Sequence, residues 1–593
     1  MPGPAHDLRL QALLLAIYVL TALFSTTPAH AGDDTVNVLH ALFTREWDRR
    51  SADNPTWAST LGDKRFNRQW PDLGPAAVAS RQAADRRFLD ELRAIDRKAL
   101  PESEQINYDM FGQMLQERIA AEPFRPWLYA IDMRSGIQFA DRLLESLLFA
   151  NPSDWEDWLA RLESFGSYMD QTIALLDQGA REGRTQPRVI IERVPDQVAR
   201  QIVADPTTSP FYRPFTSLPD GMPEADQARL RETAARAIAQ TIVPAYRRFH
   251  TFLLETYLPA ARESIAISDT PDGLAWYENR VRHFTTTDLT PRQVHEIGRA
   301  EVARIRAEME AIIREVGFEG GFQEFLAHLR TAPQFRYTSP DDLFRAYLAM
   351  SKRIDPLLTI LVGTLPRTPY GLRPIPASSA PDTTTAYYMP PSRDGLRPGY
   401  YYVNLYRPED RPTYEIPVLT VHEAVPGHHL QIALAQELRD VPEFRRSSAV
   451  TAFVEGWALY SESLGDEMGL YEDPYDRFGY LTYEMWRAVR LVVDTGMHCM
   501  GWSRARAIDF FKANAAKSEL DIVNEIDRYI GWPGQALAYK IGQLRIRELR
   551  RRAYERLGER FDIRAFHDLV LGAGAIPLDL LETRVNDWIA AQG

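Results

Sequence analysis

Two short segments combine residue types that can hold a metal ion and activate water. The first, HEAVPGHH, begins at His422, and the second, FVEGWALY, places Glu455 in an apolar helical pattern. A catalytic zinc site needs three protein ligands, supplied by histidine or carboxylate side chains, and one position left open for water. The two segments together contain such a ligand set, with Glu423 directly after the first histidine.

The spacing of the histidines departs from the common HExxH pattern, in which they lie at i and i+4 on one helix face. On an unbroken helix His428 would point about 120° away from His422, and His429 would lie about 10 Å further along the axis. Pro426 removes a backbone donor, and Gly427 accepts unusual backbone angles. We therefore expect a bulge that takes up two residues and brings His428 to the second ligand position, with His429 as the alternative ligand.

A helix that simply ends at Pro-Gly, with the histidines as caps, would be the better explanation of an isolated HExxxxH segment. Glu455 favours the metal site, because its helix is apolar on nearly all sides and is therefore expected to be buried. One face carries Phe453, Trp457 and Tyr460, and the residues around Glu455 on the other are Ala452, Ala458 and Leu459. A buried carboxylate costs several kcal/mol unless it is paired or bound to a metal. In contrast, the segment from His295 to Arg299 has arginine where a second histidine belongs, and we interpret it as a solvated helix face.

The motifs HEAVPGHHLQ, FVEGWALYSE and WPGQALAYKIG resemble the bacterial family catalogued as domain of unknown function 885, from roughly residue 35 to the C-terminus. That family is grouped with the gluzincin peptidases, whose relatives include the thimet oligopeptidase and angiotensin-converting enzyme families. The resemblance implies one Zn²⁺ ion on His422, His428 and Glu455, with Glu423 as general base. It also implies a tyrosine donor to the oxyanion, and Tyr539 is the matching position.

Residues that could contact a substrate lie on both sides of the metal motifs. The strand candidate YYYVNL, from Tyr400 to Leu405, precedes His422, and we expect it to bind an extended peptide through Tyr401 and Asn404. A core hairpin is the alternative. Tyr529 and Gln535, near Tyr539, are further candidates for substrate binding, with aromatic core packing as the rival interpretation of the tyrosines.

A polar group further along the chain could support the metal ligands. Asp494, Thr495, Gly496 and His498 stand beside the single cysteine, Cys499. We expect this group to supply hydrogen-bond partners to the ligands, and a buried helix interface is an equally good interpretation.

The elements that position these residues read as mainly helical. Residues 85–97, 224–256, 290–316 and 341–358 have apolar residues at three- and four-residue spacing, and loops are expected at 205–223 and 364–399. We expect a large multi-helical, zincin-like fold with a deep cleft and a small β element beside the metal helix. Residues 32–370 would form an N-terminal lobe and 371–593 a catalytic lobe, or the two would form one continuous domain.

Residues 1–31 predict a secretory signal peptide, with an apolar run at 10–24 and the cleavage site Ala29-His30-Ala31. The protein is therefore expected in the periplasm or outside the cell. No cysteine stands near the cleavage point for lipid attachment, and Cys499 has no partner for an internal disulfide. The net charge of −12 argues against a nucleic-acid surface. No second segment is long and apolar enough for a stable membrane span.

These observations predict a secreted zinc metallopeptidase that hydrolyses short peptides. One alternative keeps the metal and changes the substrate to a non-peptide amide or ester. The other is a non-catalytic protein that binds peptides or zinc. Glu423, which is not a ligand, speaks against simple zinc scavenging.

Overall fold

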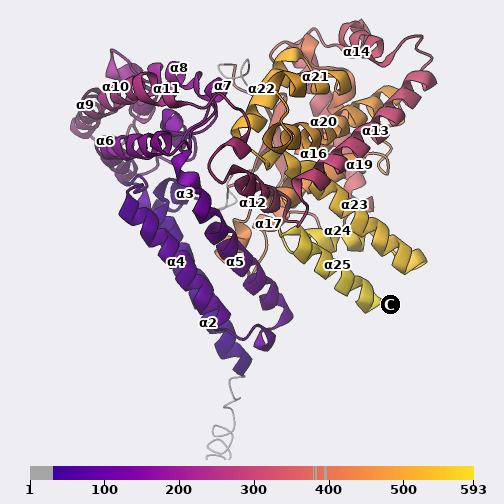
Figure 1. Cartoon of the computed structure of the whole chain (residues 1–593), viewed down its shortest axis with the longest axis horizontal. Helices are drawn as coiled ribbons and strands as arrows, with labels where there is room; N and C mark the ends of the chain where they lie inside the picture. Colours follow the sequence, from indigo (N-terminus) through magenta and orange to yellow (C-terminus); the bar gives the residue numbers. More distant parts are fainter. Residues whose placement is uncertain (1–30, 378–379, 381–383, 393–396, 593) are drawn as a thin grey trace, which may run out of the picture.

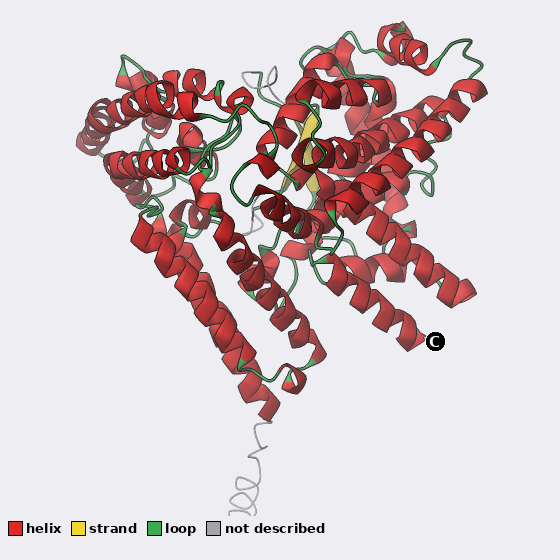
Figure 2. Ribbon diagram, viewed as in Figure 1, coloured by secondary structure: helices red, strands yellow, loops and turns green. Residues whose placement is uncertain are grey.

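Helices make up most of the chain, as predicted. The computed structural model describes residues 31–377, 380, 384–392 and 397–592. The predicted signal peptide, apart from Ala31, lies outside these residues. Figure 2 shows red helices throughout and one small yellow sheet. Among the described helices, none has the length and apolar composition needed to cross a membrane.

The helices before the metal motifs are, in chain order, α2 (Ala31–Asp53), α3 (Pro55–Thr60), α4 (Pro75–Arg93), α5 (Glu102–Ala121), α6 (Pro152–Arg181), α7 (Arg188–Ile191), α8 (Val194–Ala199), α9 (Glu224–Ala237), α10 (Val243–Phe252), α11 (Leu258–Ala260), α12 (Gly273–Thr285), α13 (Pro291–Glu315), α14 (Phe322–Thr331) and α15 (Pro340–Ile354). Those that follow are α16 (Ile416–Glu423), α17 (His428–Gln436), α18 (Glu443–Arg446), α19 (Thr451–Ser463), α20 (Pro474–Cys499), α21 (Arg504–Asn514), α22 (Glu519–Gly531), α23 (Ala538–Leu557), α24 (Ile563–Leu571) and α25 (Leu578–Gln592).

Local sequence signals fix several of these boundaries. Thr290 caps α13, where its side chain and that of Gln293 each accept a hydrogen bond from the other residue's backbone N–H, and Pro291 takes the first helical position. The predicted helix at 224–256 forms as one helical run, with π-helical turns at Ile238–Ile242 and Leu253–Tyr257.

The described chain has two hydrophobic cores. The smaller one lies between Ile131 and Ala261 and is built by α6 to α10 and the loops around them. The larger one joins residues from Leu39 to Val585. It therefore runs across the predicted lobe boundary at residue 370, as in the alternative of one continuous domain. In Figure 1 the indigo-to-magenta helices α2 to α11 stand on one side and the metal-motif helices on the other.

A three-stranded sheet lies within the segment expected to be mostly loop. β1 (Tyr370–Pro374) pairs in parallel with β3 (Gly399–Val403), and β2 (Ala386–Met389) pairs antiparallel to the other side of β3. The predicted strand is therefore present as β3. It is the central strand of the order β1-β3-β2 and has no free edge.

A cavity of about 1350 Å³ lies between the two sides of the molecule. Its walls come from α5, α12, the start of α25 and the segment that leads into α19. His422, Glu423, His428 and Glu455 are not among its lining residues, so the predicted cleft at the metal motifs stays a prediction.

Candidate metal centre

A break between α16 and α17 takes up the two extra residues of the histidine motif. The backbone N–H of Gly427 donates to the carbonyl of Val421, 2.9 Å away, across six residues in place of the usual four. The free carbonyl of Pro426 accepts a 2.8 Å hydrogen bond from the Trp457 indole. A Cβ at Gly427 would lie 2.0 Å from the carbonyl oxygen of His422, so only glycine fits this position. The two extra residues are taken up as expected, but by a break between two helices and not by a bulge within one helix.

The break brings His422 and His428 together with Glu455 of α19. One potential ligand atom of each side chain lies within 4.8 Å of the others. The two imidazole rings stand at 85° with their centres 4.8 Å apart, and His428 Nε2 lies 3.5 Å from Glu455 Oε2. His428 Nδ1 is buried without a hydrogen-bond partner. Two imidazoles and a carboxylate at this spacing are a donor set that fits one Zn²⁺ ion.

His429, the alternative ligand, has both ring nitrogens engaged elsewhere. Its Nε2 lies 3.1 Å from the Thr368 carbonyl, so Nδ1 accepts the hydrogen bond from the Tyr388 hydroxyl, 2.8 Å away. Gly399 leaves room for this contact, since a Cβ there would lie 2.3 Å from the Tyr388 hydroxyl. The described arrangement therefore matches His428, not His429, as the second ligand.

Glu423 lies at the end of α16, next to the cluster but outside the ligand set. Burial, partly offset by the charge of His428, raises the pKa of its carboxyl to about 7. The backbone N–H of Tyr388 in β2 lies near this carboxyl and acts to lower its pKa. A carboxyl group that is half ionised near neutral pH is suited to proton transfer.

Glu462, which the sequence analysis did not single out, orients the first ligand. Its Oε1 accepts a 2.7 Å hydrogen bond from His422 Nδ1, and its side chain is fully buried. This contact leaves His422 Nε2 free for a metal. Burial raises the pKa of Glu462 to about 8, against the opposing charge of Arg487, whose NH2 lies 3.7 Å away. The sequence could have identified Glu462, because it lies two turns after Glu455 on the same apolar helix.

The predicted support group on α20 does not perform this role. The Asp494 carboxylate binds the Tyr277 hydroxyl at 2.6 Å and the backbone N–H of Gly534 at 3.1 Å. His498 binds the backbone of Tyr529 through Nε2. The prediction was wrong because these side chains face α12 and the turn after α22, so the alternative of a buried helix interface holds.

The prediction that His295 lies on a solvated helix face is also wrong. The solvated face predicted around it is present at Glu296 and Arg299, but His295 itself is only 5% exposed. Its Nδ1 lies 2.8 Å from the Thr495 hydroxyl on α20. The pairing of α13 with α20 buries this histidine as a core hydrogen-bonding residue.

Tyr539 reaches the cluster because two glycines let α19 and α23 approach closely. A Cβ on Gly456, next to Glu455, would lie 2.6 Å from the Cα of Gly542, one turn after Tyr539. Against the effect of burial, His428 and the nearby Tyr539 hydroxyl lower the pKa of the Glu455 carboxyl. The guanidinium of Arg490 packs 4.3 Å from the centre of the tyrosine ring.

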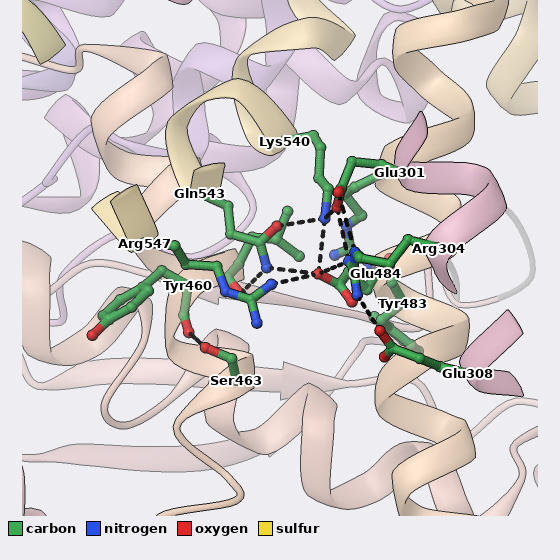
Figure 3. Close-up of polar contacts among 12 residues, drawn as sticks. Glu301, Arg304, Glu308, Tyr460, Ser463, Tyr483, Glu484, Lys540, Gln543 and Arg547 are labelled. Carbon is green, nitrogen blue, oxygen red and sulfur yellow. Dashed lines mark hydrogen bonds and ion pairs between the residues drawn. The ribbon is translucent and has the colours of Figure 1, made fainter. Parts of the chain in front are cut away.

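A buried charge cluster anchors the start of α23 on the other side. Figure 3 shows Lys540, the residue after Tyr539, among Glu301, Glu484 and Gln543. Lys540 Nζ lies 2.8 Å from each of the two carboxylates and 2.7 Å from the glutamine oxygen, and its side chain is fully buried. The cluster thereby links α23 to α13 and α20 and fixes the position from which Tyr539 extends.

Three of the four predicted substrate-binding residues have buried side chains. Tyr401 is fully buried under β3, and the Asn404 amide binds the carbonyls of Ala380 and Thr384. The Tyr529 hydroxyl is buried against Arg490 Nε at 2.8 Å. Gln535, half-buried, accepts a hydrogen bond from an arginine of α22.

The strand edge near Glu423 belongs to β2, so the prediction of β3 as the substrate strand was wrong. The backbone N–H of Asn404 donates to Thr385, which makes this pair a hydrogen-bonded one. Alternation along an antiparallel ladder then leaves Tyr388 and Ala386 in non-bonded pairs, with their backbone groups directed away from β3. Ala386–Met389 was missed because it lies among Pro, Ser and Thr residues, although its Ala-Tyr-Tyr-Met sequence has strand character.

Comparison with known proteins adds the family. The model of the family described as bacterial protein of unknown function (DUF885) matches residues 55–585. The chain belongs to this family. The membership predicted from the three motifs is thus confirmed, and the matched residues include the metal cluster.

Two solved structures have a similar fold. One, of a candidate lipoprotein from Colwellia psychrerythraea, has 27% sequence identity and a TM-score of 0.88, over 93% of this chain and 99% of the other. A second, of a candidate lipoprotein of unknown function from Shewanella oneidensis, has 19% identity and a TM-score of 0.71, over 91% and 98% of the chains. No functionally curated protein matches the chain significantly.

Proposed function

We propose that this DUF885 protein is an exported zinc metallopeptidase with a zincin-like fold that hydrolyses short peptides. One observation carries the proposal: side chains from three helices meet as a His422, His428 and Glu455 cluster, beside a buried Glu423 that is not needed as a ligand. A Zn²⁺ ion held by these residues would polarise the scissile carbonyl and lower the pKa of a water molecule.

Glu423 takes the role of general base. With a pKa near 7 its carboxylate can accept a proton from the attacking water and return it to the leaving amine. The backbone N–H of Tyr388 lies near this carboxyl and favours its ionised form.

Tyr539 supplies a hydrogen-bond donor at the same site. Its hydroxyl already reaches Glu455, and a phenol at this position can turn toward an oxyanion that develops on the substrate carbonyl. Arg490, packed on the tyrosine ring, restricts where the ring can lie.

The free edge of β2 favours a peptide as the substrate. Backbone groups of Ala386 and Tyr388 point away from β3, and the backbone N–H of Tyr388 lies near Glu423. An extended peptide can pair with such an edge and pass beside the general base. A folded protein does not offer an extended backbone, and we therefore infer short or unfolded peptides as substrates.

Export is supported by the predicted signal peptide and by the description of the two similar structures as candidate lipoproteins. This chain differs from a lipoprotein in one respect. Its single cysteine, Cys499, lies far from the leader, so it offers no thiol there for lipid attachment.

The test combines metal analysis with digestion of a peptide library, followed by mass spectrometry. We expect about one zinc per chain and cleavage of unstructured peptides by the wild type. The Glu423→Gln variant should keep the zinc and lose turnover, since a neutral amide cannot accept the proton. Zinc binding without cleavage, or cleavage confined to non-peptide esters and amides, would refute the proposal.

A further inference from the structure

The cavity between the two sides of the molecule carries two arginines that no carboxylate neutralises. Arg50 of α2 and Arg280 of α12 both line it and are half-buried. Among the described residues, no carboxylate oxygen lies within 4.0 Å of either guanidinium. The Arg50 NH1 contacts the sulfur of Met114, and the Arg280 Nε donates to the carbonyl of Pro533 at 3.2 Å.

The other charged groups on the cavity wall are largely paired with each other. Asp109 binds Arg97, Glu117 lies 2.9 Å from His283, and Glu582 binds two arginines of α23. Asp579 accepts a hydrogen bond from a backbone N–H and has no arginine partner. Two unpaired cations thus face one unpaired carboxyl, and the cavity has a surplus of positive charge in a protein whose net charge is −12.

Both guanidinium groups are held in place without a counter-ion. Arg50 stacks on the Trp57 ring at 4.2 Å, and Arg280 on the Phe284 ring at 4.5 Å. Burial lowers the pKa of each group to about 10, which means that both stay charged at neutral pH. A partly desolvated cation without a partner gains most from an anion that enters the same space.

The cavity also approaches the candidate metal centre. Thr451, at the start of α19, forms part of its wall, and Glu455 lies one turn further along the same helix face. One turn is about 5 Å, and two residues of extended peptide span about 7 Å. His422, Glu423, His428 and Glu455 are not among the residues that line the cavity. The proposal therefore requires a peptide bound at the metal centre to extend past Thr451 into it.

We propose that this cavity binds acidic side chains of the substrate, through Arg50 and Arg280, so that the preferred substrates are acidic oligopeptides. The inference rests on the proposed function, and it names the substrate class of that same site. Two separate arginines fit a segment with two or more acidic residues better than a single terminal carboxylate. At about 1350 Å³ the cavity exceeds a typical small-molecule pocket and can hold several residues.

The experiment measures binding to the zinc-loaded Glu423→Gln protein by titration calorimetry. Three blocked peptides of equal length are compared: one with two glutamates distal to the expected cleavage point, its glutamine counterpart, and the glutamine peptide with a free C-terminal carboxylate. We expect the glutamate peptide to bind about 10- to 100-fold more tightly than the amidated glutamine peptide at low salt. The preference should shrink as the ionic strength rises.

Two substitutions locate the effect. Arg50→Gln and Arg280→Gln should each reduce the preference for the glutamate peptide, and the double variant should abolish it. Neither change leaves a carboxylate without its partner, so both proteins should fold, and Arg280→Lys should keep part of the preference. Arg345→Gln, on an exposed arginine of α15, is the matched control and should leave the preference unchanged.

Equal binding of the glutamate and glutamine peptides would overturn the inference, and so would a preference that survives in the double variant. If the glutamine peptide with a free C-terminal carboxylate binds as tightly as the glutamate peptide, the arginines bind the peptide terminus and not acidic side chains. Tight binding of the acidic peptide with no hydrolysis by the zinc-loaded wild type would refute the proposed function while the cavity assignment stands. Hydrolysis of the acidic and neutral peptides with equal kcat/KM would refute the cavity assignment alone.

Discussion

Removal of the Glu462 carboxylate tests whether the buried contact behind His422 controls the metal site. Glu462 Oε1 lies 2.7 Å from His422 Nδ1, and the side chain has no exposed surface. Glu462→Ala removes the acceptor, frees the imidazole to rotate and allows the wrong nitrogen to carry the proton. Glu462→Gln keeps an oxygen acceptor at the same place and loses only the charge.

The size of the effect follows from the contact. A zinc ion bound to His422 would favour the ionised form of Glu462. A hydrogen bond to an ionised group contributes about 1.5–3 kcal/mol, which corresponds to roughly a 10- to 100-fold change in an equilibrium constant. Partners of metal-bound histidines typically change metal affinity by the same factor. Arg487 NH2, 3.7 Å from Glu462, loses its nearest carboxylate in the alanine variant and would repel a dication more strongly. We therefore expect a larger loss in Glu462→Ala than in Glu462→Gln.

The assay is zinc affinity measured by competition with a chromophoric chelator, with thermal unfolding as a check on folding. Glu472→Ala, on an exposed glutamate nine residues after the end of α19, is the control and should bind zinc like the wild type. An unchanged zinc affinity in Glu462→Ala would show that this carboxylate does not orient a ligand, and His422 Nε2 would lose its assignment as the donor atom.

Three further predictions concern other parts of the molecule. His428→Ala should lose the zinc measured by elemental analysis, while His429→Ala should keep nearly full occupancy, and the reverse result would exchange the two ligands. Tyr539→Phe should lower kcat on the order of 10²-fold with little change in KM, whereas an effect confined to KM would make this tyrosine a substrate contact. Burial raises the pKa of Asp494 from 3.8 to about 7, so its contribution to stability is present at low pH and is lost as the pH rises through 7. Between pH 4 and pH 8 the free energy of unfolding of the wild type, measured with denaturant, should fall by on the order of 4 kcal/mol. The Asp494→Asn variant should lack this fall. If the free energies of the two proteins depend on pH in the same way, the assignment is wrong.

The ligand cluster was accessible from the sequence because each step depended on a strong local rule. Proline and glycine interrupt a helix whatever surrounds it, and the two extra residues require a compensating break. Glu455 was identified from burial, and the same reasoning applied two turns later would have identified Glu462. The predictions that failed were those that depended on which residue of a neighbouring helix a side chain contacts. The roles of three side chains depend on how α12 and α13 pack against α20: those of His295, Asp494 and His498. The spacing of apolar residues along one segment does not show which helices pack together.

The sheet shows the same limit. β3 was visible as a run of three tyrosines and a valine, but the position of a strand within a sheet depends on its neighbours. β1 and β2 lie in a segment whose Pro, Ser and Thr content indicates loops, so the free edge was assigned to the wrong strand.

The larger core also sets the order in which this chain can complete its fold. Phe43 and Phe111, near the N-terminus, pack against Phe444 with ring centres 5.0 and 5.4 Å apart, more than three hundred residues later than Phe111. At 5–20 residues per second, synthesis of that interval takes roughly 15–70 s. During this time α2, α4 and α5 lack the surface that covers them, while the residues of the smaller core, between 131 and 261, are all made before Phe444. The smaller core can therefore form first, and the larger core must wait until Phe444 has been made.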